Sequence, residues 1–181
     1  MMAPLPVGKV GAALAILLSA GGAHAGIRQF SYDPADAETR AVTGPVTLVI
    51  DQRMFGARVM QMRATEAKAT TDLARADIGG RDGVSRALGA DARERQLYRV
   101  LPADDGGAFI DALCPGSKRA WLALSPVRYG EALHAKVVGD DPAGGPVKLC
   151  HSLDFAFHGE WSVPAGSQLR IDPVAPPDFP N

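Results

Sequence analysis

The sequence has few aromatic residues, only two cysteines and no excess of charge of either sign. Aromatic residues make up 6% of the 181 positions, and 19 basic residues balance 20 acidic ones. A nucleic-acid-binding domain usually carries a basic patch or stripe on one face, and the sequence contains no such block. The same balance gives no attraction to an anionic membrane surface. We therefore expect no nucleic-acid partner.

Long hydrophobic runs are also missing, apart from one at the start. Lys9 precedes the apolar run Val10–Leu18, which is too short to span a bilayer of roughly 30 Å as a helix. Ala23-His24-Ala25 then supplies the A-x-A pattern that signal peptidase accepts. We expect residues 1–25 to be a signal peptide that is cleaved between Ala25 and Gly26.

Cleavage at this point predicts a periplasmic or secreted protein, with no integral membrane segment once the signal is removed. An uncleaved membrane anchor is the alternative for this segment. A lipid anchor would need a cysteine at the cleavage point, and Gly26 stands there instead.

The two cysteines, Cys114 and Cys150, are far apart in the sequence and form no C-x-x-C pattern. An isolated pair in an oxidising compartment usually forms a disulfide. Closing a loop of this length stabilises a fold by roughly 4 kcal/mol. We therefore predict a structural disulfide between them.

Recognisable cofactor and metal motifs are absent. The sequence contains no phosphate-binding loop, dinucleotide fingerprint, H-E-x-x-H pattern or calcium loop. No G-x-S-x-G elbow surrounds a serine. We expect no cofactor.

Alternating and β-branched patterns predict a mostly extended chain. Expected strands cover residues 27–32, 46–51, 57–65, 96–101, 119–124, 132–138 and 147–157, whereas 66–76 suits either helix or strand. The clearest helix lies at about 105–114, where Phe109, Ile110, Leu113 and Cys114 share one face. Cys114 would end this helix and face the sheet, so the disulfide would join helix and strand.

We expect a single globular domain over residues 26–170 and a proline-rich extended tail over 171–181. The predicted class is α+β and rich in strand. It has an antiparallel sheet with one clear helix, in a two-layer or sandwich-like arrangement.

The most chemically diverse stretch covers residues 151–161. If it is a strand, alternation places Asp154, His158 and Glu160 on one face, with successive neighbours about 7 Å apart. These three are candidate catalytic residues and, together with His134 across the hairpin, candidate metal ligands. The alternative is an ordinary solvent-exposed strand face.

The sequence favours a non-enzymatic binding or accessory module outside the cytoplasm, with another envelope protein or component as its partner. The alternative is a small hydrolase or metal-dependent enzyme that uses the Asp154/His158/Glu160 face. A third class is a stabiliser or inhibitor that presents the loop at 79–91 or at 139–146 to a target.

Overall fold

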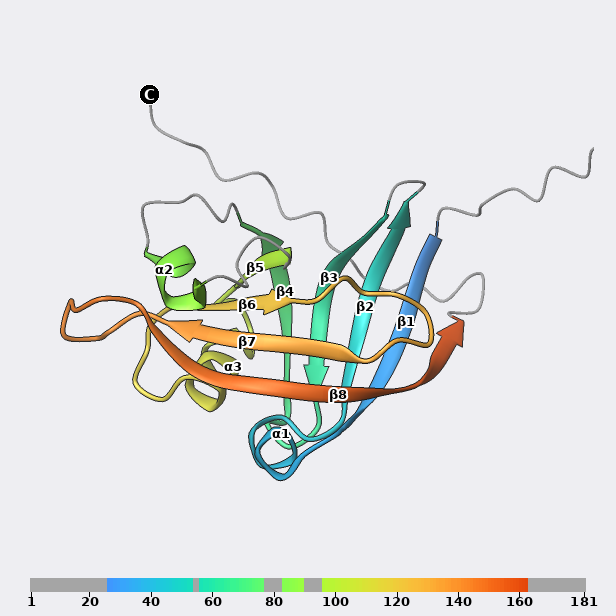
Figure 1. Cartoon of the computed structure of the whole chain (residues 1–181), viewed down its shortest axis with the longest axis horizontal. Coiled ribbons are helices and arrows are strands. Elements are labelled where there is room, and N and C mark those ends of the chain that lie inside the picture. Colours follow the sequence, from blue (N-terminus) through green and yellow to red (C-terminus); the bar gives the residue numbers. More distant parts are fainter. Residues whose placement is uncertain (1–25, 54–55, 77–82, 90–95, 163–181) are drawn as a thin grey trace, which may run out of the picture.

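A computed structural model describes residues 26–53, 56–76, 83–89 and 96–162 (Figure 1). The expected signal peptide and the proline-rich tail lie outside these residues. The eight strands of the described part are β1 (Gly26–Pro34), β2 (Val46–Arg53), β3 (Gly56–Ala64), β4 (Ala69–Arg75), β5 (Gln96–Val100), β6 (Ala120–Leu124), β7 (Leu133–Gly139) and β8 (Lys148–Ser162). Three helices connect them: α1 (Ala37–Val42), α2 (Val84–Leu88) and α3 (Gly106–Leu113).

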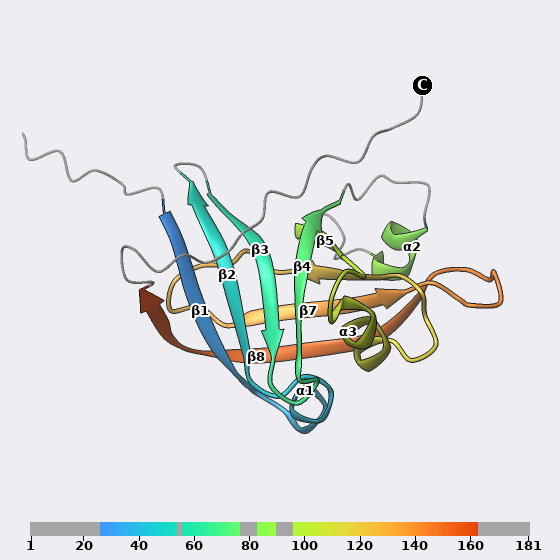
Figure 2. The same ribbon diagram turned by 180° about the vertical axis from the view of Figure 1, so that it is seen from behind.

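The strands form a closed antiparallel barrel in sequence order. Each strand pairs with the next, and β1 also pairs with β8. In Figures 1 and 2, β1–β4 run steeply while β6–β8 cross in front of or behind them. Closure gives every strand a neighbour on both sides, which removes the free edges that a sheet otherwise exposes.

This barrel shows that the expected two-layer or sandwich-like α+β class is wrong. The antiparallel pairing and the helix expected at 105–114 are present, the latter as α3. The error lies at the end of the chain, because β8 continues beyond residue 157 to Ser162. The extension lets β8 pair with β1 from Arg28↔Ser162 to Pro34↔Phe155, which closes the sheet.

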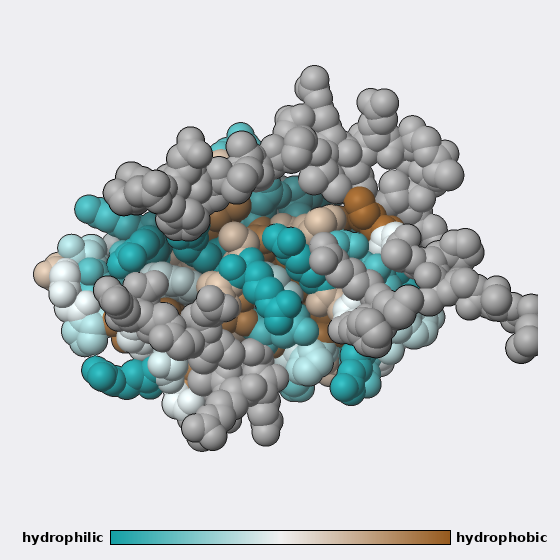
Figure 3. Space-filling view, turned by 90° about the horizontal axis from the view of Figure 1, so that it is seen from above, coloured by the Kyte–Doolittle hydropathy of each residue, from teal (hydrophilic) through white to brown (hydrophobic). Residues whose placement is uncertain are grey.

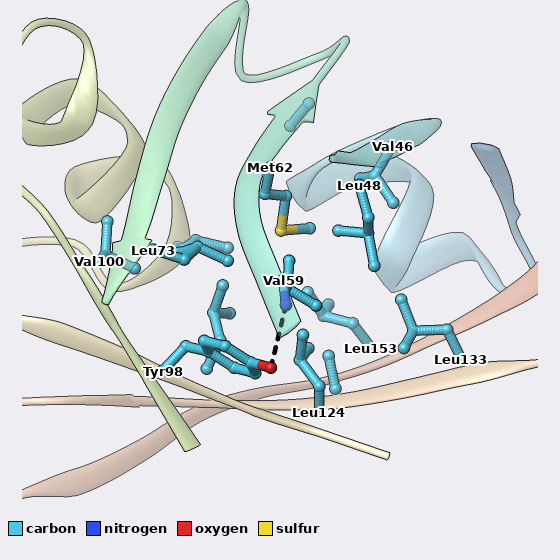
Figure 4. Packing of buried hydrophobic residues seen from close by; sticks show 14 of the residues in the cluster. Val46, Leu48, Val59, Met62, Leu73, Tyr98, Val100, Leu124, Leu133 and Leu153 are labelled. Atoms are coloured by element: carbon cyan, nitrogen blue, oxygen red, sulfur yellow. Dashed lines mark hydrogen bonds between the residues drawn. The ribbon is translucent and has the colours of Figure 1, made fainter. Parts of the chain in front are cut away.

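The barrel interior is a single hydrophobic cluster. Side chains from all eight strands contribute to it, Phe30, Leu48, Met62, Leu73, Tyr98, Leu122, Leu133 and Phe155 among them. An eight-stranded barrel is just wide enough for side chains to fill it. Figure 4 shows this packing around Val59 and Met62. The α3 residues Phe109, Ile110 and Leu113 belong to the same cluster, and α3 packs against β4.

A smaller hydrophobic cluster lies outside the barrel wall. Val84 and Leu88 of α2 pack there with Trp121 and Ala123 of β6, together with Leu97 and Val138. Residues of β6 are consequently buried on both faces of the sheet. Within the described ranges, no helix is long and apolar enough to cross a membrane.

The predicted disulfide between Cys114 and Cys150 is confirmed. Cys114 caps the C-terminus of α3 and Cys150 lies in β8, with their Cα atoms 5.5 Å apart. Gly139 of β7 lies against this bond, because a Cβ added there would approach the Cys114 Sγ to 2.2 Å. The disulfide therefore packs directly on the backbone of β7, at a position where only glycine fits.

The Tyr98 hydroxyl forms a hydrogen-bonded bridge between β5 and β3. It accepts a hydrogen bond from the Val59 amide at 3.1 Å and donates one to Gln96 at 2.7 Å (Figure 4). Val59 lies beyond the last β3–β4 pair, which is Gln61↔Asp72. The hydroxyl thus links β3 to β5 at a level of the barrel where β4 is no longer paired with β3. Burial raises the pKa of Tyr98, although the hydrogen bond from Val59 acts in the opposite direction.

Replacing Tyr98 by phenylalanine is expected to lower the free energy of unfolding by about 2 kcal/mol, because the fully buried Val59 amide loses its partner. Urea denaturation measures this loss. Tyr129→Phe is the matched control, since that side chain is 66% exposed and its substitution should change stability by less than about 0.5 kcal/mol. Equal effects of the two substitutions would contradict the role of the bridge.

Candidate functional site

Strand β8 and its neighbours hold the histidines of the described chain. Three of the four histidines in the sequence lie there, and each bonds a carboxylate through Nδ1. The pairs are His134–Asp154 at 2.5 Å, His151–Glu38 at 2.8 Å and His158–Asp33 at 2.7 Å. They connect β8 to β7, to α1 and to β1 respectively. Such exposed pairs contribute little stability individually.

Helix α1 is anchored to the middle of β8. Asp36 caps α1 by accepting hydrogen bonds from the Thr39 amide and hydroxyl, at 2.8 Å and 2.7 Å. The Thr39 hydroxyl in turn accepts the Asp154 amide at 2.9 Å. The hydrogen bonds from Thr39 lower the pKa of Asp36. This chain of contacts fixes the backbone that carries Asp154.

A β-bulge in β8 separates Glu160 from Asp154 and His158, which simple alternation places on one face of the strand. Ser31 pairs with Gly159 but Tyr32 pairs with Phe157, so His158 is the extra residue. Beyond the bulge, Glu160 lies opposite the buried Phe30, and directly opposed residues share a face of the sheet. Glu160 therefore lies on the inner side, whereas His158 remains on the outer one.

The structure accordingly gives each candidate residue a different partner. Asp154 bonds His134 across the hairpin of β7 and β8, and His158 bonds Asp33. Glu160 forms a two-pronged ion pair with Arg28, in which Nη2 donates to Oε2 at 2.7 Å. Within the described residues, no group of three His, Cys, Asp or Glu side chains is placed to hold a metal ion.

A shallow groove of about 170 Å³ lies on the outer surface where β1, β2 and β8 meet. Its lining combines hydroxyl, carboxylate, imidazole and indole groups. The residues that supply them are Ser31, Asp33, Thr47, Thr65, His158 and Trp161.

Trp161 is the most conspicuous side chain of this groove. It is 58% exposed, although its indole N–H donates to the Ser31 hydroxyl at 2.9 Å. The Ser31 hydroxyl also lies 3.1 Å from that of Thr47. These bonds hold the ring in place, and it stacks on no other aromatic ring of the described chain. The groove thus presents a fixed, uncovered aromatic face beside polar groups.

Among the described residues, no base is hydrogen-bonded to the Ser31 hydroxyl of the groove. Activation of a serine needs a base within hydrogen-bonding reach of its hydroxyl. In the described structure, the Ser31 hydroxyl contacts Thr47 and Trp161, while His158 is bonded to Asp33. Burial raises the pKa of neighbouring Tyr32 to about 12, with a further contribution from Glu131, so its phenol stays protonated at neutral pH.

Sequence reasoning missed Ser31, Asp33, Thr47 and Trp161 as members of one surface. The strands expected at 27–32 and 147–157 end before Asp33 and Trp161, so the sequence pattern places neither residue in the sheet. The signal in the sequence that could predict this surface is the alternation of β8. It continues past Gly159 when His158 is treated as an extra, bulged residue.

In the view from above, hydrophobic residues of the described ranges that are not covered appear between hydrophilic ones (Figure 3). A comparison with protein-family models, curated proteins and solved structures finds no match to this chain.

Proposed function

We propose that the protein is an exported, non-enzymatic binding module that holds a saccharide component of the cell envelope in the groove between β1, β2 and β8. The observation that carries this proposal is the exposed, hydrogen-bonded indole of Trp161 beside the Asp33–His158 pair. The signal pattern of residues 1–25 and the disulfide support a location outside the cytoplasm.

A sugar ring has the two surfaces that this groove matches. One face of the ring carries C–H groups, which pack on an aromatic face, and its edge carries hydroxyl groups, which bond carboxylate, imidazole and hydroxyl side chains. The groove has the volume of about six water molecules at ~30 Å³ each, so it accommodates a single ring. A partner cannot instead add a strand to the sheet, since each described strand is already paired on both sides.

Tryptophan fluorescence gives a direct test. Of the two tryptophans, Trp121 is 2% exposed and Trp161 is 58% exposed, so a ligand in the groove changes the emission of Trp161. Titration with N-acetylglucosamine and glucose oligosaccharides is expected to give a saturable change. Trp161→Ala, followed by calorimetry, should weaken binding about tenfold or more through loss of the stacking face.

Leu149→Ala is the matched control, because Leu149 is an exposed hydrophobic residue outside the groove lining. Its affinity should equal that of the unmodified protein. Asp33→Asn should weaken binding without removing the aromatic face. Emission that does not respond to any sugar of the panel at millimolar concentration would refute the proposal.

A further inference from the structure

A second and larger hollow, of about 530 Å³, lies between α2, the loop from α3 to β6, and the hairpin from β7 to β8. Both ribbon views place α2 and the hairpin tip on the side of the barrel away from β1 (Figures 1 and 2). The volume is typical of small-molecule sites. The charged residues in its lining are Arg86, Lys118, Arg119, Asp140 and Asp141.

The two acidic side chains of this hollow accept hydrogen bonds from the loops that form it. Asp140 accepts the amides of Lys118 and Arg119, at 2.9 Å and 2.8 Å, and the Arg119 Nε at 3.1 Å. Burial alone would raise the pKa of Asp140, but these hydrogen bonds outweigh it and the pKa is lowered. Asp141 accepts the Ala143 amide at 3.0 Å within the hairpin turn. Both carboxylates therefore serve the loops themselves.

The basic side chains differ in how they are held. The Arg119 guanidinium is bonded to Asp140 and lies 5.4 Å from the centre of the Trp121 ring, which orients its plane. Lys118 and Arg86 make no ion pair within the described residues. The backbone of Lys118 is nevertheless fixed by Asp140. The described lining of the hollow thus carries three cations and two carboxylates, an excess of one positive charge in a chain whose net charge is −1.

We propose that this hollow binds a small anion that carries a phosphate group. Arg119 supplies a planar set of donors that matches phosphate oxygens, and Lys118 and Arg86 supply positive charge that exceeds the negative charge of Asp141. The site is separate from the groove at Trp161 and does not depend on its function. A free phosphorylated metabolite and a lipid phosphate headgroup share this chemistry.

Pyrophosphate is the probe for the first experiment. Titration of the isotopically labelled protein at ~0.15 M salt should shift amide signals around residues 118–119 and 140–147. Lys118→Gln and Arg86→Gln should each weaken binding about tenfold, because each removes a charge-assisted hydrogen bond. Lys148→Gln is the matched control, since it removes one exposed positive charge from the same hairpin outside the hollow.

Unchanged affinity of the Lys148→Gln variant supports a specific site. Equal weakening by all three substitutions, or no saturable shift with millimolar pyrophosphate, would overturn it in favour of general charge attraction. Vesicles of phosphatidylcholine with and without phosphatidic acid distinguish the source of the phosphate. Binding to the acidic vesicles that pyrophosphate displaces assigns a headgroup, whereas binding to pyrophosphate alone assigns a soluble anion.

Discussion

Replacing both cysteines by alanine is expected to lower the free energy of unfolding by about 4 kcal/mol and the melting temperature by ~10 °C. The bond joins residues separated by 36 positions, and the loop it closes contains β6 and β7. Without the bond, that loop gains conformational freedom in the unfolded chain. The Cys114 side chain is also fully buried, so its packing is reduced as well.

Guanidinium denaturation of the oxidised protein and of the Cys114→Ala/Cys150→Ala variant measures the difference. A reducing agent provides the control, because it should destabilise the unmodified protein and leave the variant unchanged. A mass increase of about two hydrogens on reduction identifies the bond independently. Equal stability of variant and parent would show that the link does not constrain the unfolded chain.

Gly106→Ala is expected to cost about 3 kcal/mol of stability, because α3 begins in direct contact with the chain that precedes it. A Cβ at this position would lie 1.8 Å from the Leu101 carbonyl oxygen and 3.2 Å from the Thr71 hydroxyl. That carbonyl also accepts the Thr71 hydroxyl at 3.1 Å. The start of α3 must therefore move away from the barrel, or the Thr71 hydrogen bond must break.

Gly107 provides the control one position along the same helix. A Cβ there meets no atom within 4 Å, so Gly107→Ala should raise stability by about 0.5 kcal/mol through helix propensity. Urea denaturation of both variants is expected to show changes in the free energy of unfolding of opposite sign for these neighbouring glycines. If Gly106→Ala left the free energy of unfolding unchanged, the loop at Leu101 would have to move aside without loss of stability.

Local patterns in the sequence predict most of the strands and the helix α3. β2 is recognisable by its β-branched residues, although Leu48, Val49 and Ile50 are buried in succession. α3 places Phe109, Ile110 and Leu113 on one face. The ambiguous segment 66–76 contains β4, whose buried residues are Ala69, Thr71 and Leu73, and Thr71 lies beside Gly106 of α3. Close approach of the helix requires small side chains, and small side chains weaken the alternating signal.

The closure of the barrel and the fate of Glu160 depend on contacts that no local window contains. Pairing of β1 with β8 joins the two ends of the described chain, and one bulged residue, His158, reverses the side on which the following residues project. Helix α1 has six residues and is held by Asp36 and Thr39, so its periodicity is too short to detect. The position of Asp154 opposite His134 likewise depends on a register shift between Val137 and Val138, which the alternation of the two strands does not reveal.

The pairing of β1 with β8 also sets the order of events in folding. Strand β1 can lie beside β2 early, but its other side stays open until residues 155–162 arrive. Contacts between segments so distant in sequence form slowly. A chain that emerges gradually, from a ribosome or through a translocation pore, therefore cannot complete its barrel until the last described strand has emerged. The topology therefore leaves one side of β1 unpaired until β8 is available.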